Sequence, residues 1–150
     1  MTEIYYFSIP PIAWIIVAIL AAVIIAVFIM ILAPMLTCRL VIKPPCVSLK
    51  ALVASSTTFC VEDVKGVKIV DKLDDGLKPV MRVWGMSLPG FRWGWFKLEN
   101  GAKAFLAVAG APEKYIVVEL KNGEYVIMAP KKVDEVFKKL VSMGMNIEWK

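Results

Sequence analysis

Residues 118–140 read VELKNGEYVIMAPKKVDEVFKKL and combine a hairpin signal with a helix signal. An Asn-Gly pair between apolar runs is the strongest short-range indication of a β-hairpin. We therefore expect Asn122-Gly123 to join strands 115–121 and 124–129, with Lys121 opposite Glu124 across a two-residue turn. The face expected to form the core carries Ile116, Val118, Leu120, Tyr125 and Ile127.

The second half of this stretch has the periodicity of an amphipathic helix. Apolar residues recur at helical spacing while charged residues take the opposite side, which predicts a helix over about 131–143. A helix with one apolar face that follows antiparallel strands must lie on the sheet or cap its open end. Its apolar positions are Val133, Val136, Phe137, Leu140 and Val141.

Residues 89–101, PGFRWGWFKLENG, end in a second hairpin signal that should join strands 91–99 and 102–109. With a two-residue turn, Trp93 and Trp95 share a face with Ala104 and Leu106. Both faces of this hairpin are largely apolar, although only one face of a half-solvated sheet should be. Two interpretations stay open. Either a bulge at Gly94 or a covering helix places both faces in the core, or the two tryptophans form an exposed patch.

The chain before these hairpins is also β-rich. Runs 47–55, 57–64 and 67–73 have strand composition and are separated by turn residues. Residues 37–46 contain a Pro pair and are expected to form an extended juxtamembrane linker. One small domain is therefore expected over 47–150.

Residues 4–38 contain no charged side chain. The apolar centre of this run is long enough to cross a hydrocarbon core about 30 Å thick, so we expect a transmembrane helix over 12–36 and an N-terminal segment over 1–11 outside the cytoplasm. A cleaved signal peptide is disfavoured, because the N-terminus has no basic residue and the apolar run is too long. With no ionisable residue at mid-depth, this helix is interpreted as a passive anchor.

Charge flanking the span predicts its orientation. No basic residue precedes the helix, whereas Arg39, Lys43 and Lys50 follow it, and cationic flanks tend to stay in the cytoplasm. We expect a single-pass protein of the cell membrane with its N-terminus outside and its domain in the cytoplasm. All 18 basic residues but only 12 of the 13 acids follow residue 38, which gives this part a net charge of +6. The charges are spread, so a solvated basic surface is expected, and nucleic-acid binding is not.

The chain has three cysteines, Cys38, Cys46 and Cys60. In a cytosolic domain they should be reduced thiols. A Cys46–Cys60 disulfide becomes possible if the domain faces outside or if the source is a hyperthermophile. The absence of Gln and His and the presence of only three Asn fit a hot habitat, which predicts a thermophilic and archaeal source.

Catalytic and cofactor motifs are missing from the sequence. Without histidine the chain lacks the commonest general base and metal ligand. It has no phosphate-binding glycine loop, no nucleophile elbow and no CxxC pair. We expect no enzyme activity, no cofactor and no metal site.

A family resemblance rests on the R-x-x-G pattern at 82–85, Pro89-Gly90, Gly94, Phe96, Asn100-Gly101 and the stretch 118–140. In these residues the chain resembles the prokaryotic pleckstrin-homology-like (PH-like) domains of bacteria and archaea, whose members often lie beside transmembrane helices. The resemblance covers about 47–145. It implies a mainly-β α+β fold with about seven antiparallel strands in two nearly orthogonal sheets, forming a β-barrel with one end closed by the C-terminal helix.

The phosphoinositide site of the eukaryotic relatives does not carry over. That site uses a cluster of cations around the first hairpin, and the corresponding stretch here, VSLKALVASSTT, offers only Lys50. The resemblance therefore implies the scaffold and its place beside a membrane, and no particular ligand.

The function predicted from the sequence is a membrane-tethered, non-enzymatic scaffold for protein–protein contact or self-association. Its expected partners are the lipid bilayer and a protein that is either unidentified or a second copy of the chain. The candidate binding residues are Arg92, Trp93, Trp95 and Lys97, because Trp and Arg are enriched at interface hot spots. The alternatives are a sensor of the lipid surface or of a small ligand, in which the same residues contact headgroups, and an accessory subunit of a larger membrane complex.

Overall fold

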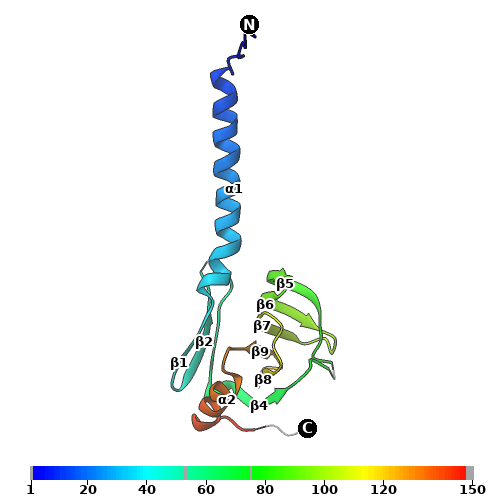
Figure 1. The fold of residues 1–150 in the computed structure, drawn as a ribbon. Helices are drawn as coiled ribbons and strands as arrows, with labels where there is room; N and C mark the ends of the chain where they lie inside the picture. Colours follow the sequence, from blue (N-terminus) through cyan, green and yellow to red (C-terminus); the bar gives the residue numbers. More distant parts are fainter. Residues whose placement is uncertain (1, 53, 75, 148–150) are drawn as a thin grey trace.

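A computed structural model of the chain describes residues 2–52, 54–74 and 76–147. The first element is the long helix α1, Pro11–Thr37, which rises from the rest of the molecule as a single rod (Figure 1). Pro11 begins the helix at a position where its missing N–H costs no hydrogen bond. Nearly all of its side chains are exposed, and it is the one described helix long and apolar enough to cross a membrane.

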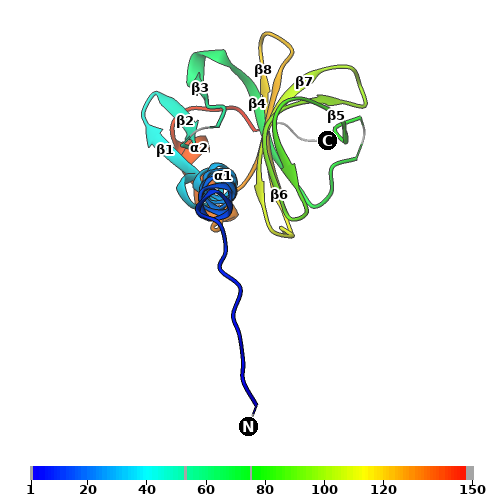
Figure 2. The same cartoon turned by 90° about the horizontal axis from the view of Figure 1, so that it is seen from above.

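Two sheets follow α1 (Figures 1 and 2). The first has three antiparallel strands in the order β1-β2-β3, and the second has six in the order β4-β8-β9-β7-β6-β5. A 3-10 turn, Val61–Asp63, joins them, and α2, Val133–Ser142, ends the described fold. The strands are β1 (Arg39–Lys43), β2 (Cys46–Lys50), β3 (Thr57–Cys60), β4 (Val64–Val70), β5 (Pro79–Leu88), β6 (Phe91–Leu98), β7 (Lys103–Ala109), β8 (Tyr115–Leu120) and β9 (Tyr125–Ala129).

The α+β class, the two sheets and the C-terminal helix are confirmed, but four details differ from the prediction. Nine strands lie in the described residues, where about seven were expected. The expected linker contains β1, because Pro44-Pro45 forms a turn that folds β1 back on β2. β7 and β9 are parallel. The large sheet keeps two separate edges, β4 and β5, so it curls without closing into a barrel (Figure 2).

Both hairpins have the predicted Asn-Gly turns but a register shifted by one residue. In the second hairpin Glu119 faces Tyr125, and the Leu120 N–H donates to the Glu124 carbonyl, so the predicted Lys121–Glu124 pair is wrong. The loop has three residues, with Gly123 at positive φ and the Asn122 Oδ1 accepting from the Glu124 N–H.

The first hairpin has the same three-residue loop, in which the Asn100 Oδ1 accepts from the Ala102 N–H. A one-residue shift moves each side chain opposite a different partner. Trp93 and Trp95 therefore lie opposite Ala107 and Phe105, and they do not share a face with Ala104 and Leu106 as predicted.

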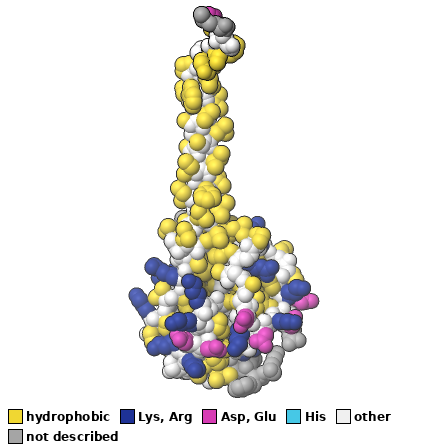
Figure 3. All heavy atoms as spheres, in the orientation of Figure 1, with side chains coloured by type: hydrophobic (Ala, Val, Ile, Leu, Met, Phe, Trp, Pro, Cys, Tyr) yellow, Lys and Arg dark blue, Asp and Glu magenta, His cyan; other side chains and the backbone are white. Residues whose placement is uncertain are grey.

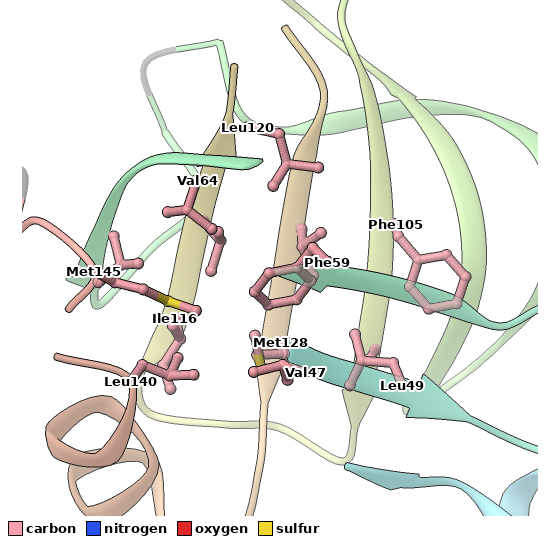
Figure 4. Close-up of a cluster of buried hydrophobic side chains, with 14 of the residues drawn as sticks. Val47, Leu49, Phe59, Val64, Phe105, Ile116, Leu120, Met128, Leu140 and Met145 are labelled. Carbon is pink, nitrogen blue, oxygen red and sulfur yellow. The ribbon is translucent and has the colours of Figure 1, made fainter. Parts of the chain in front are cut away.

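Both faces of the six-stranded sheet contribute to the core, each through its own cluster of buried residues, whereas the edge strand β5 is mostly exposed. One face packs against the three-stranded sheet and α2, and Figure 4 shows Val47, Leu49 and Phe59 of the small sheet facing Phe105 and Met128 of the large one. The other face is covered by the curl of its own sheet. Its buried residues are Leu77, Phe96, Leu98, Ala104, Leu106, Val117 and Ile127. The apolar residues expected on the second hairpin's core face are thus divided between the two clusters.

Gly94 does not form a bulge, because β6 pairs with β7 without interruption. It lies directly opposite Gly85 of β5, and both glycines have φ of +135°. A Cβ built on either residue would lie 2.4 Å from a carbonyl oxygen of the facing strand. Gly94 therefore allows β5 and β6 to approach closely, and the register shifts lie in β5, between Pro79 and Met81 and between Arg82 and Trp84.

Candidate functional site

The four candidate binding residues predicted from the sequence do not share one surface. Trp93 is only 4% exposed, and its Nε1 donates to the Ser55 carbonyl at 2.6 Å. Trp95 is half-buried. Arg92 and Lys97 are exposed but, five positions apart on one strand, they project from opposite faces of the sheet.

The Trp93 side chain belongs to the core. It and Trp95 each make an edge-to-face contact with Phe105, with ring centroids 5.7 and 5.4 Å apart. The exposed tryptophan patch is therefore wrong for Trp93, whose burial follows from the cover that the three-stranded sheet provides. Binding by Arg92 and Lys97 stays a prediction.

A different apolar surface is exposed on β5. Among the described residues after the helix, the large hydrophobic side chains that are exposed are Leu52, Val80, Met81, Val83, Trp84 and Ile147. Four of these six lie on β5, where Trp84 is 72% exposed. Because β5 ends the sheet order, the backbone groups of its outer edge have no neighbouring strand.

This part of β5 lies on the same side of the domain as the end of α1. Arg39, at the start of β1, pairs with Lys50, at the end of β2, so the loop after β2 returns to the base of the helix. There the Leu52 N–H donates to the Thr37 Oγ1 at 2.9 Å. In Figure 1 the large sheet is stacked so that β4 lies farthest from α1 and β5 lies nearest to its level.

A hollow of about 470 Å³ joins the loop after β2 to β5. Ser55 and Ser56 line it from the loop, and Val83, Trp84 and Trp95 line it from the sheet, together with Lys103 and Glu124. We call Leu52, Val83 and Trp84 the apolar rim. Leu52 lines a second hollow with Leu36 and Thr37 of α1, and Ser56 lines both hollows, so the apolar rim adjoins the end of α1.

The charges of the domain are distributed unevenly about this side. On the face that Figure 3 shows, the part of the domain next to the helix carries hydrophobic and basic side chains, whereas the acidic side chains visible there lie farther from the helix. Arg39 and Lys50, both exposed, stand beside the helix base. These two cations suit an anionic surface, while Lys103 and Glu124 offset each other in the hollow beside the rim.

Sequence reasoning missed Leu52 and Trp84. The sequence of β5, PVMRVWGMSL, lacks the alternation of apolar and polar residues that predicts a strand, because its two bulges each add a residue. For this reason β5 was not predicted from the sequence. The adjacent apolar residues Val83 and Trp84, directly before Gly85, were the one signal of a bulged strand that exposes a large side chain.

The described residues offer little catalytic chemistry. They contain no group of three or more Cys, Asp or Glu side chains placed to hold a metal ion. The Tyr5 hydroxyl donates to the Glu3 carboxylate at 2.6 Å, which raises the pKa of Tyr5, but this pair lies before the helix and outside the domain.

Comparison with known proteins gives one family match. The family described as bacterial PH domain matches residues 48–143. The chain belongs to this family. No curated protein and no solved structure shows significant similarity to it.

The bacterial PH domain match begins inside β2 and ends just after α2, so it leaves α1 and β1 outside. It confirms the prokaryotic PH-like family predicted from the sequence. PH-like domains are generally non-catalytic binding modules, and the apolar helix suggests membrane anchoring. The two together are compatible with a membrane-associated binding module.

The three cysteines of the chain take two roles. Cys46 and Cys60 face each other across β2 and β3 and form a disulfide bond. Cys38, directly after α1, is free, and its thiol donates to the Met35 carbonyl at 3.3 Å. The disulfide contradicts the reduced thiols expected of a cytosolic domain. Of the two circumstances that favour it, a thermophilic source stays a prediction, whereas an external domain is the opposite of the orientation that the flanking charges predict.

Proposed function

We propose that this protein is a membrane-tethered, non-enzymatic binding module whose PH domain lies on the surface of the bilayer that α1 crosses, with the apolar rim in the headgroup region. The observation that carries this proposal is the position of the rim. Leu52, which is 60% exposed, is hydrogen-bonded through its backbone to the last residue of α1, and Trp84 lies across the adjoining hollow.

The chemistry of the rim supports an interfacial depth. Trp is enriched at membrane–water interfaces, where its ring meets apolar chains and its N–H meets water or headgroups. The outer edge of β5 has backbone groups without a neighbouring strand, and these could not be satisfied in hydrocarbon. Hydrated headgroups can pair them, so the edge can lie at the surface without inserting deeply.

Docking on the bilayer would also cover the exposed apolar edge strand β5, which could otherwise promote aggregation. A long strand at a sheet edge with exposed apolar side chains is a site of aggregation unless something covers it. Covering by the bilayer removes this hazard. The two bulges of β5 further disfavour pairing with a second strand.

Basic residues add to the attraction in the proposed orientation, with the N-terminus outside and the domain in the cytoplasm. Arg39 and Lys50 would lie next to the inner leaflet, where each cation near an anionic surface contributes about 1 kcal/mol. This orientation is the one that the distribution of basic residues predicts.

Spin-label depth measurements test the proposal. A nitroxide is placed at Val83 in full-length protein reconstituted in bilayers containing anionic lipid, with Cys38 replaced by Ser so that the label has one site. We expect the Val83 label to be more accessible to oxygen, which concentrates in the membrane, than to a water-soluble nickel complex. A label at Asp134 on α2 should show the reverse order. Equal accessibility profiles at the two positions would refute docking.

A protein partner is the second candidate, and it retains the scaffold function predicted from the sequence. The observation that favours it is the free edge of β5 after its two bulges, from Trp84 to Leu88, where the regular strand can accept an added strand from a partner or from a second copy. In the same experiment, self-association through β5 would appear as dipolar broadening between Val83 labels that disappears on dilution with unlabelled protein.

A further inference from the structure

A cavity of about 280 Å³ lies between the two sheets at the base of α1. Leu40 and Leu49 line it from the three-stranded sheet, and Phe91, Trp93 and Met128 line it from the six-stranded sheet. We infer that this cavity binds part of one acyl chain of an anionic membrane phospholipid. The inference rests on the proposed docking of the domain, because the acyl chain of the lipid must pass from the bilayer into the cavity.

Small side chains produce the gap. Ala107 and Ala109 of β7 line the cavity with small side chains, and Ala107 belongs to the core cluster between the two sheets. Elsewhere between the sheets the packing is dense, as Val47 and Phe59 are at most 2% exposed. An apolar cavity of this kind favours a hydrocarbon occupant, because water would find few polar partners there.

The residues at the mouth of the cavity indicate that the acyl chain enters from the bilayer. Cys38 and Arg39, the two residues that directly follow α1, both line it. Lys131, at the start of the segment leading to α2, supplies a second cation, and among the described residues that line the cavity there is no acid. The continuity with the membrane span and the two cations favour a lipid whose headgroup is anionic.

The size of the cavity fits part of a chain. At about 30 Å³ for each methylene group, similar to the share of one water molecule, it holds roughly nine methylenes. The headgroup phosphate would then remain near Arg39, and the second acyl chain would stay in the bilayer.

Photo-cross-linking tests the inference. Full-length protein is reconstituted with phosphatidylglycerol that carries a diazirine near the methyl end of one chain, and cross-linked peptides are identified by mass spectrometry. We expect cross-links within residues 91–93, 107–109 and 128–131. Phosphatidylcholine with the same chain should label these peptides less, and Arg39→Gln should bring the phosphatidylglycerol yield down to that level.

A cavity-filling variant gives the matched comparison. Ala107→Leu should lower the cross-linking yield about tenfold. The larger side chain would displace about two methylene groups of the acyl chain, and burial of two methylenes is worth about that factor in binding. Ala111→Leu, an exposed alanine outside the cavity lining, should leave the yield unchanged. If Ala107→Leu does not fold, the positions of the cross-links in the wild type and the yield of Arg39→Gln still test the inference.

Two results would overturn the inference. One is cross-linking of phosphatidylglycerol confined to α1, and the other is labelling of the cavity peptides by a free diazirine fatty acid but not by the phospholipid. If the Val83 label still reports docking in either case, only the acyl-chain site fails. If the Val83 label does not report docking and the cavity peptides are not cross-linked, the proposed docking of the domain is itself wrong.

Discussion

Replacing Gly94 with alanine is expected to unfold the domain. Gly94 and Gly85 face each other with φ of +135°, a conformation that L side chains rarely adopt. The added Cβ would lie 2.4 Å from the Trp84 carbonyl oxygen and 2.6 Å from the Gly85 Cα, and backbone atoms on a paired strand cannot move aside cheaply. We expect a loss of about 4 kcal/mol or more, measured as the free energy of unfolding by denaturant titration of full-length protein in detergent.

Gly110→Ala is the matched control. Gly110 also has positive φ, at +74°, but a Cβ there would meet no atom within 4 Å. This variant should lose only about 1 kcal/mol, the cost of the backbone conformation alone. Equal unfolding free energies for the two variants would show that β5 and β6 do not approach as closely as described.

Replacing both Trp84 and Leu52 with serine is expected to release the domain from the bilayer. If the two side chains together remove roughly 150 Å² of apolar surface from water, they contribute about 4 kcal/mol at about 25 cal/mol per Å². The ratio of docked to undocked molecules should therefore fall several hundredfold. The measurement is the accessibility of the Val83 nitroxide to the nickel complex, which should rise to the value seen at Asp134.

Ile147→Ser controls for the loss of an exposed apolar residue. Ile147 is 41% exposed and lies beside β4, at the edge of the large sheet opposite to β5. This variant should leave the Val83 accessibility unchanged, and both variants should keep the unfolding midpoint of the wild type. If Ile147→Ser releases the domain as fully as the rim variant does, the rim has no special role in docking.

The sequence predicted those elements whose signals are local. The helix α1, the Asn-Gly turns and the apolar face of α2 each depend on residues a few positions apart. The hairpin register was wrong by one residue because Asn-Gly fits both two-residue and three-residue loops, and the choice depends on which residue takes positive φ.

Long-range features could not be predicted in this way. The parallel pairing of β7 with β9 and the close approach of Gly85 to Gly94 join segments whose contact leaves no periodic pattern. The same limit applies to the candidate site. Trp84 and Trp93 are chemically identical, and only the cover provided by the three-stranded sheet makes one buried and leaves the other exposed.

The most direct test of bilayer docking is the depth of the Trp84 ring. The fluorescence of Trp84 is obtained as the difference between wild-type protein and Trp84→Phe in the same bilayers, quenched by lipids that carry a nitroxide at the headgroup, near the glycerol or near the chain end. Docking by the apolar rim predicts the strongest quenching from the nitroxide near the glycerol. Quenching of Trp84 by aqueous iodide alone, with no effect of any nitroxide lipid, would contradict it.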